Sequence, residues 1–436
     1  MNKRYEDLIN AAKNLSHLDT RINLLRQIVN EFPASIEAYG LLAIAEREDG
    51  SHHQSANDFV VWAALQGMPP RASAEAAMGY HQAQLWMQAI RLFEMGPFDD
   101  LTPMQQLLYV DCLRQDNDIL RASALLDQMA RPKDENLASY IRLKAYLGVH
   151  LNRPAEVLQE DSQLGDKVDL NLKGNCFYVD QLIQTHMTLN NWTQVINLIE
   201  DQIISFPTDS YYRDLLDALN LYLFDKPAQY RNRDDASSRK QVYESAAYLK
   251  GVASNLVMVG NVTQMYELIA SLDLVDGSGL EFGVRHGFSL NVLARLLPSK
   301  QFYGFDSFVG LPVDWHTEPA GSYSVGGKAP VVEKNVTLIG GWFSDTVSYI
   351  LDQEIDVSLI HVDCDLYEST IEALRPLAAS SKLKPGTVIL FDEYLTNLTW
   401  QADEFKAFQE IVQEFKLSYE YLAFGLITKQ CLVRIK

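Results

Sequence analysis

Apolar residues in the first half of the chain recur with the spacing of amphipathic helices. Trp192, Val195, Ile196 and Ile199 follow the i, i+3, i+4 and i+7 spacing of one helix face, and Leu182, Ile183, His186 and Leu189 follow a similar helical spacing. Asn190 and Asn191 lie between the two segments and are typical of a turn. The pattern therefore predicts a helical hairpin here, and similar patterns predict helix after helix up to about residue 225.

Turn residues punctuate this helical region every 32 to 38 residues, each followed by a short apolar helix. They are Gly50, Gln84, Asp116, Asn152 and Asn190. The segments FPAS (32–35) and FPTD (206–209) resemble a helix end followed by a proline-marked helix start. A period near 34 is typical of solenoids built from helix pairs. Residues 1–225 thus loosely resemble tetratricopeptide repeats, which by analogy bind partners or self-associate, and a degenerate all-α bundle is the alternative.

Residues 226–240 are polar and without periodicity, which predicts a linker. From residue 241 the pattern changes to short apolar runs that alternate with helical segments. The predicted strands are 279–284, 301–305, 335–340, 356–362, 387–391, 419–424 and 427–435, and the predicted helices are 243–256, 262–271, 289–297, 368–383 and 400–415. This alternation predicts that residues 241–436 form a doubly wound, Rossmann-like α/β domain with a terminal hairpin.

Composition and charge narrow the classes of function. The formal net charge of -20 argues against a nucleic-acid partner. The four cysteines are widely separated, so neither a zinc site nor a disulfide framework is expected. The polar N-terminus predicts no signal peptide, and no apolar run is long enough for a membrane span. These features favour a cytoplasmic protein.

A glycine-rich turn and an acidic residue follow the first two strands of the α/β region. The sequence LEFGVRHGFS contains Glu281, Gly283, Gly287 and Ser289, and glycines at such a turn allow close approach to a ligand. The middle glycine of a dinucleotide fingerprint is missing, which disfavours NAD. Asp306, at the end of the second strand, has the position of a ribose ligand, although it could instead cap a helix.

Carboxylates gather at the ends of two later strands. Asp363 and Asp365 follow the strand 356–362, and Asp392 and Glu393 follow 387–391. Ligands bind at the carboxyl ends of strands in open α/β sheets. Four carboxylates there would repel one another unless a cation neutralises them, and oxygen ligands favour magnesium. Capping of the following helices would account for one or two of these acids.

Four segments in order, GFDSFVGLP, GWFSDT, HVDCDLYEST and KPGTVILFDEY, resemble the macrocin O-methyltransferase family, which methylates sugar hydroxyls. The resemblance covers about residues 240–436 and implies a class I methyltransferase fold, S-adenosylmethionine and magnesium. It places Glu281, Gly283 and Ser289 around the methionine part of the cofactor, and Gly287 and Asp363 are further candidate cofactor-binding residues. It places Asp306 and Ser307 at the ribose and adenine, and assigns Asp365, Asp392 and Glu393 to the metal. Glu393 stands where the family usually has aspartate.

The expected reaction is methyl transfer to a hydroxyl of a sugar, a glycan or a glycosylated metabolite. Asp365 and His316 are the candidate bases, and His361 is expected to be a core residue rather than a catalytic one. His316 lies in a glycine-rich loop, 313–330, that is either a lid over the acceptor or a surface insertion. Trp342 is expected to pack either near adenine or in the core.

The alternative functions are a repeat-based scaffold with an inactive methyltransferase-like domain, and an NAD oxidoreductase. A homodimer is plausible.

Overall fold

The computed structural model describes residues 3–133, 135–163, 176–230, 240–253 and 256–436. The chain forms two compact units, Met1–Lys144 and Ala145–Lys436. The predicted linker at 226–240 falls within the second unit, and its residues 231–239 lie outside the described residues, so this domain division stays a prediction. No helix among the described residues is long and apolar enough to cross a membrane.

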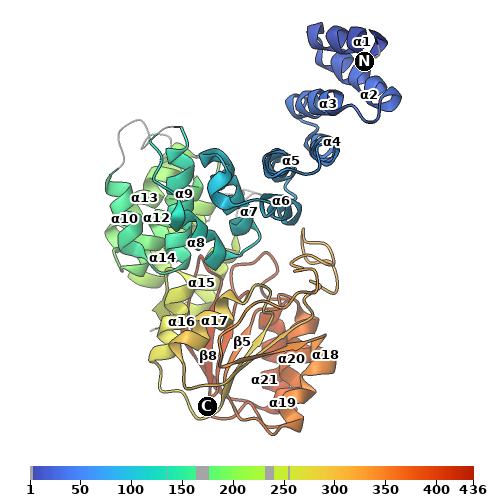
Figure 1. Cartoon of the computed structure of the whole chain (residues 1–436). Helices are drawn as coiled ribbons and strands as arrows, with labels where there is room; N and C mark the ends of the chain where they lie inside the picture. Colours follow the sequence, from blue (N-terminus) through green and yellow to red (C-terminus); the bar gives the residue numbers. More distant parts are fainter. Residues whose placement is uncertain (1–2, 134, 164–175, 231–239, 254–255) are drawn as a thin grey trace. The chain divides into compact units, whose positions relative to one another are not determined.

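The first unit is helical (Figure 1). Its helices are α1 Lys3–Asn14, α2 Leu18–Glu31, α3 Ile36–Glu48, α4 His52–Leu65, α5 Pro70–Gln82, α6 Trp86–Phe93, η1 Phe98–Asp100, α7 Pro103–Gln115 and α8 Ile119–Gln128, and α9 Leu137–His150 crosses into the second unit. Successive helices bury small apolar cores between them: one is centred on Leu25 and Ile28 and another on Phe59 and Ala63. Each helix thus buries its apolar face against its neighbours in sequence, as stacked helix pairs do.

The same tight turn recurs at the five predicted junctions. A residue with positive φ ends a helix, and the next N–H donates to the carbonyl oxygen five residues earlier, as in a Schellman motif. The left-handed residues are Gly50, Gln84, Asn117, Asn152 and Asn190. The donors and acceptors are Ser51 and Glu46, Leu85 and Tyr80, Asp118 and Leu113, Arg153 and Gly148, and Asn191 and His186. The helical character of this region is confirmed, whereas its tetratricopeptide type stays a prediction.

Two carboxyl groups in the first unit face each other across α3 and α4. Glu46 is 1% exposed and pairs with Arg26 at 2.7 Å. Burial, together with a hydrogen bond to Glu46 and its charge, raises the pKa of Asp58 to about 7. Folding therefore favours the protonated acid, and deprotonation of Asp58 opposes folding.

We expect the stability of the first unit to fall as pH rises from about 4 to about 7. In that window the folded state binds the Asp58 proton more tightly than the unfolded state does. Asp58→Asn should remove this dependence and unfold at a higher temperature than the wild type at pH 8. Calorimetry of the full chain at pH 5 and pH 8 measures the effect, with the exposed Asp7→Asn as control. Equal pH dependence in wild type and D58N would contradict the assignment.

The second unit combines helices with one mixed sheet (Figure 1). The helices are α10 Pro154–Ser162, α12 Cys176–Thr188, α13 Trp192–Ser205, α14 Tyr211–Phe224, α15 Lys240–Val252, α16 Val262–Ser271, α17 Phe288–Leu296, α18 Phe343–Thr346, α19 Ser348–Asp352, α20 Tyr367–Ala379 and α21 Glu404–Phe415. The strands are β1 Val257–Met258, β2 Ser278–Phe282, β3 Phe302–Asp306, β4 Val336–Gly340, β5 Val357–Val362, β6 Val388–Phe391, β7 Tyr419–Phe424 and β8 Cys431–Ile435.

The eight strands lie in the order β1-β7-β8-β6-β5-β2-β3-β4. β8 is antiparallel to β6 and β7, while the other neighbouring strands are parallel. Helices α16 and α17 pack on one face, and α15, α20 and α21 pack on the other. The predicted α/β class and the terminal hairpin are confirmed, with the correction that the reversed strand makes the sheet mixed.

Strand order reverses next to β2, whose neighbours are β3 on one side and β5 on the other. The chain moves outward through β3 and β4 and then returns to β5. Such a switch point leaves a crevice at the carboxyl ends of the strands, where ligands bind in open α/β sheets. The predicted site residues after β2, β3, β5 and β6 therefore lie at one edge of the sheet.

Candidate active site

Gly283 forms the floor of the crevice at the end of β2. Its φ is +94°, and a Cβ atom built there would lie 1.7 Å from the carbonyl oxygen of Asp363 at the end of β5. Its N–H donates to Phe305 O at 2.9 Å, so the turn is also tied to β3. No residue with a side chain fits this position, because the backbone of Asp363 occupies the space that a Cβ atom would need.

Asp306 at the end of β3 closes the glycine turn. One carboxylate oxygen accepts the N–H groups of Val284 and Arg285 at 2.8 and 2.7 Å, and the other accepts Phe308 N–H at 2.6 Å. A carboxylate has about four lone-pair positions, so these three bonds leave capacity for one more donor. The side chain is thus fixed against the turn in an orientation that can still accept a ribose hydroxyl.

A buried chain of polar groups runs beneath the crevice from β2 to β6. Glu281 accepts the Ser289 hydroxyl at 3.0 Å and contacts His361 Nδ1 at 2.9 Å, and His361 Nε2 lies 3.7 Å from Asp392. Burial alone lowers the pKa of His361, but its contacts with Asp392 and Glu281 hold the pKa well above the usual range. Gln430 completes the chain by donating to Asp392 at 2.7 Å. These groups link the ends of β2, β5 and β6 in one polar network.

His361 is a core residue, as predicted, because it is fully buried under the sheet edge. It stands directly opposite Glu281 in the β2–β5 register and packs edge-on against Tyr266 of α16, with ring centroids 5.9 Å apart. Tyr266 was not foreseen from the sequence. Its helix has an ordinary amphipathic pattern, and only the packing of α16 on the sheet brings it to the site.

Asp363 and Asp365 follow β5 at the centre of the crevice. Burial and then the charge of Asp392 raise the pKa of Asp363 well above its usual range. Burial and then the charges of Glu393 and Asp392 raise the pKa of Asp365 to about 8. Asp365 also has a left-handed backbone, with φ +61°. A carboxyl group of this pKa is matched to proton transfer near neutral pH.

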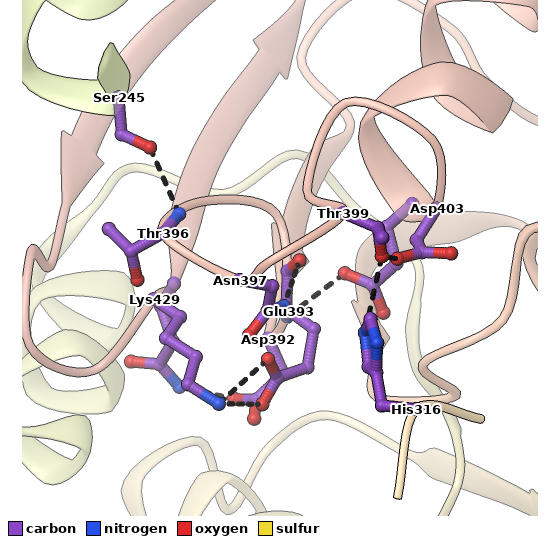
Figure 2. Close-up of polar contacts among 11 residues, drawn as sticks. Ser245, His316, Asp392, Glu393, Thr396, Asn397, Thr399, Asp403 and Lys429 are labelled. Carbon is purple, nitrogen blue, oxygen red and sulfur yellow. Dashed lines mark hydrogen bonds and ion pairs between the residues drawn. The ribbon is translucent and has the colours of Figure 1, made fainter. Parts of the chain in front are cut away.

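The two carboxylates after β6 have partners that were not identified from the sequence. Lys429 Nζ lies 3.1 and 3.0 Å from the two carboxylate oxygens of Glu393 (Figure 2). The neighbouring Gln430 donates to Asp392. The backbone N–H of Glu393 donates to Glu404 at 3.0 Å. The first turn of α21 and the residues before β8 therefore both support this pair of acids.

The predicted magnesium ligands do not fit a metal ion in this arrangement. Both oxygens of Glu393 already contact an ammonium group, and Asp392 accepts a bond from Gln430. Within the described part of the chain, no three His, Cys, Asp or Glu side chains are grouped so that they could hold an ion. Of the three predicted ligands Asp365, Asp392 and Glu393, the last two therefore already have protein partners for their carboxylate oxygens.

His316 reaches the site from the loop between β3 and β4. Its Nε2 lies 3.2 Å from the Thr399 hydroxyl, which in turn donates to Asp403 (Figure 2). The loop itself is ordered by backbone bonds, because Leu311 and Ser322 pair and Gly327 N–H donates to Phe308 O. Since Thr399 donates to Asp403, its oxygen accepts from His316 Nε2–H.

The remaining predicted residues border this edge of the sheet. Gly287 has φ +73° and stands at the start of α17, where Ser289 also begins the helix. The Ser307 hydroxyl bonds within its own loop, accepting from Val309 N–H and donating to Gly310 O, each at 3.3 Å. Trp342 is 42% exposed at the start of α18, so it is not a core residue.

Residues 280–394 match the family model of a methyltransferase domain. The match runs from β2 to just beyond β6 and includes the glycine turn, Asp306 and the carboxylates. The helical first part is therefore followed by an α/β domain of the methyltransferase type, a fold for which S-adenosylmethionine is the general cofactor. A search of curated proteins finds no match.

Three solved methyltransferase structures align with the chain at low similarity. An apo TDP-rhamnose 3'-O-methyltransferase of calicheamicin biosynthesis is 19% identical, covers 56% of this chain and 93% of its own, and has a TM-score of 0.28. Human N-acetylserotonin methyltransferase with its cofactor is 13% identical, with coverages of 71% and 99% and a TM-score of 0.26. An O-methyltransferase family protein from Burkholderia thailandensis is 13% identical, with coverages of 73% and 97% and a TM-score of 0.26.

Proposed function

We propose that the chain is an S-adenosylmethionine-dependent O-methyltransferase that acts on a hydroxyl of a sugar, a glycan or a glycosylated metabolite. The observation that carries the proposal is the arrangement at the carboxyl ends of three neighbouring parallel strands, β2, β3 and β5, which are followed by the glycine turn at Gly283, the fixed carboxylate of Asp306 and the raised-pKa carboxyl of Asp365. The methyltransferase-domain match covers all three. The class of acceptor rests on the sequence resemblance alone.

The cofactor would be held along the carboxyl ends of β2, β3 and β5. Gly283 provides open backbone, Asp306 accepts from the ribose, and Asp363 lies beside the methionine end. When bound, S-adenosylmethionine supplies a methyl group activated on a sulfonium sulfur. Glu281 and Ser289 bond to each other beneath the turn and hold its shape. The protein's contribution at this end is positioning, because transfer needs acceptor oxygen, methyl carbon and sulfur in line.

Asp365 is the residue that we assign to the acceptor proton. The acceptor hydroxyl loses its proton to the Asp365 carboxylate as its oxygen bonds to the methyl carbon, and the carbon–sulfur electron pair stays on sulfur. His316 is the second candidate, because Thr399 and Asp403 orient its ring. Magnesium assistance, predicted from Asp365, Asp392 and Glu393, is not part of the proposed steps because Lys429 already engages Glu393.

Asp306→Asn should weaken S-adenosylmethionine binding by about 10- to 100-fold, the size expected for hydrogen bonds to a charged group. The amide loses the charge and one accepting oxygen, which the ribose and the turn N–H groups share. Isothermal titration of S-adenosylmethionine into the full chain measures this, with Asp345→Asn, an exposed carboxylate, as control. Titration of NAD should give no heat. The proposed cofactor site would be contradicted by unchanged affinity for S-adenosylmethionine in D306N, or by a wild type that binds NAD and not S-adenosylmethionine.

The helices before the α/β domain have a separate proposed role. We infer that the recurring helix pairs present a surface to a protein partner or to a second copy of the chain. The basis is the repeated turn geometry at residues 50, 84, 117, 152 and 190. Size measurement of the purified chain by light scattering tests the homodimer, for which the expected mass is twice that of one chain.

A further inference from the structure

Strand register brings a lysine and a glutamine to the two carboxylates after β6. β8 is antiparallel to β6, and Cys431 pairs with Phe391. The residues that precede Cys431 therefore lie opposite the residues that follow Phe391. Gln430 meets Asp392 at 2.7 Å, and one step further Lys429 meets Glu393 at 3.0 Å. This pairing is a direct consequence of the antiparallel hairpin.

The Lys429 side chain is held in place at both ends. Its backbone has φ +64°, and its carbonyl oxygen accepts Leu395 N–H at 3.0 Å, which ties the turn to the segment after β6. Its ammonium group lies at nearly equal distances from both oxygens of Glu393, whose side chain is 14% exposed (Figure 2). The ammonium thus contacts both oxygens of a mostly buried carboxylate, as a bound metal ion would.

The surroundings of this contact are strongly acidic. Asp392 and Asp403 lie near enough for their charges to act on Asp365. Glu404 is fully buried, and one of its carboxyl oxygens has no hydrogen-bond partner in the described structure. Lys429 is the cation that acts on both Asp365 and Glu393. A site with so many carboxylates needs a positive charge, and here the chain supplies one.

We propose that Lys429 is a built-in cation that takes the place of a divalent metal ion among Asp365, Asp392 and Glu393. The ammonium contacts both oxygens of Glu393, and its positive charge repels an incoming cation. The site therefore works without a divalent ion, and the lysine, not magnesium, holds Glu393 in position near Asp365. This inference rests on the proposed function for the role of the site, but the contact between Lys429 and Glu393 does not depend on methyl transfer.

The test is binding of Mn²⁺ alone, followed by electron paramagnetic resonance of the free ion, to the full chain and three variants. Wild type should take up no Mn²⁺ at millimolar concentration. Lys429→Met, which keeps an unbranched chain of similar length without charge, should bind Mn²⁺ at least about tenfold more tightly than the wild type. Lys429→Arg keeps the charge and should behave as wild type.

Lys436→Met is the matched control. Lys436 follows the other end of β8 and pairs with Glu420 at 3.0 Å, so its loss removes one lysine and one ion pair of the same kind away from the crevice. It should leave Mn²⁺ binding unchanged. Adding Glu393→Gln to Lys429→Met should abolish the gained Mn²⁺ binding, because the Glu393 carboxylate freed from Lys429 is the group expected to bind the ion.

Two results would overturn the proposal: Mn²⁺ binding by the wild type with a micromolar Kd, or a K429M variant that folds and binds no more Mn²⁺ than the wild type. Circular dichroism and the unfolding temperature show whether K429M folds. If K429M does not fold, K429R is measured instead, and Mn²⁺ binding by K429R contradicts the proposal. Failure of the proposed function would show as absent S-adenosylmethionine binding, which leaves these ion-binding results unaffected.

Discussion

Asp365→Asn is expected to lower kcat for methyl transfer by about 10²- to 10⁴-fold, the contribution typical of a positioned general base. The amide is isosteric but cannot take the acceptor proton. Affinity for S-adenosylmethionine should stay within a factor of about three, because in the proposed site Asp365 faces the acceptor and not the cofactor. Initial rates of S-adenosylhomocysteine formation with a sugar acceptor, at saturating cofactor, measure the change. Asp352→Asn, an exposed carboxylate at the end of α19, should keep the wild-type rate.

The same residue sets the expected pH profile. Asp365 acts as a base only when deprotonated, and its pKa is raised to about 8 by burial and by Glu393 and Asp392. The wild-type rate should therefore rise with pH through about 8 and then level off. The residual rate of D365N should lack this rise. If D365N keeps most of the rate and the rise, the base is another group, and His316→Gln is the next variant to measure.

The α/β part of the fold follows closely from the sequence, for a physical reason. Strands buried on both faces have nearly continuous apolar runs, and the predicted runs 301–305, 356–362 and 387–391 are each followed directly by an aspartate. The observed strands β5 and β6, at Val357–Val362 and Val388–Phe391, differ from the predicted ranges by one residue at the start. β1, at Val257–Met258, was missed because two residues show no periodicity.

Helix boundaries depend on side chains that the periodicity does not report. α21 was predicted from Trp400 but begins at Glu404, because residues 400–402 form turns below the site. Glu404 accepts the N–H of Glu393, so the helix start is set by a contact with a segment that precedes it. A buried acid of this kind looks like an ordinary exposed helix residue in the sequence.

The acids of the site were identified from the sequence, but their partners were not. Asp363, Asp365, Asp392 and Glu393 stand out because they directly follow apolar strands. Lys429 and Gln430 lie 36 and 38 residues away from the acids they contact, and their role depends on the register of the antiparallel β8. Without those partners the negative charge of the four carboxylates has no visible counter-charge in the sequence, which is why the sequence favours magnesium. Counting back from Cys431 in a correctly paired hairpin would have found the lysine.

Gly283→Ala is expected to weaken S-adenosylmethionine binding by about 100-fold or more and to lower the unfolding temperature. The added Cβ would lie 1.7 Å from Asp363 O, so β2 and β5 would have to separate at the point where the cofactor is proposed to bind. The alanine would also have φ +94°, which disfavours any side chain.

Gly67→Ala separates the two effects, because Gly67 has φ +78° but no atom within 4 Å of a built Cβ. It should cost only about 1 kcal/mol of stability from backbone strain and leave cofactor affinity unchanged. Titration calorimetry and thermal unfolding of both variants give the comparison. If G283A binds S-adenosylmethionine as tightly as G67A does, the cofactor does not approach the backbone at the end of β2. The crevice between β2 and β5 would then lose its proposed role, and the raised-pKa carboxyl of Asp365 would need another explanation.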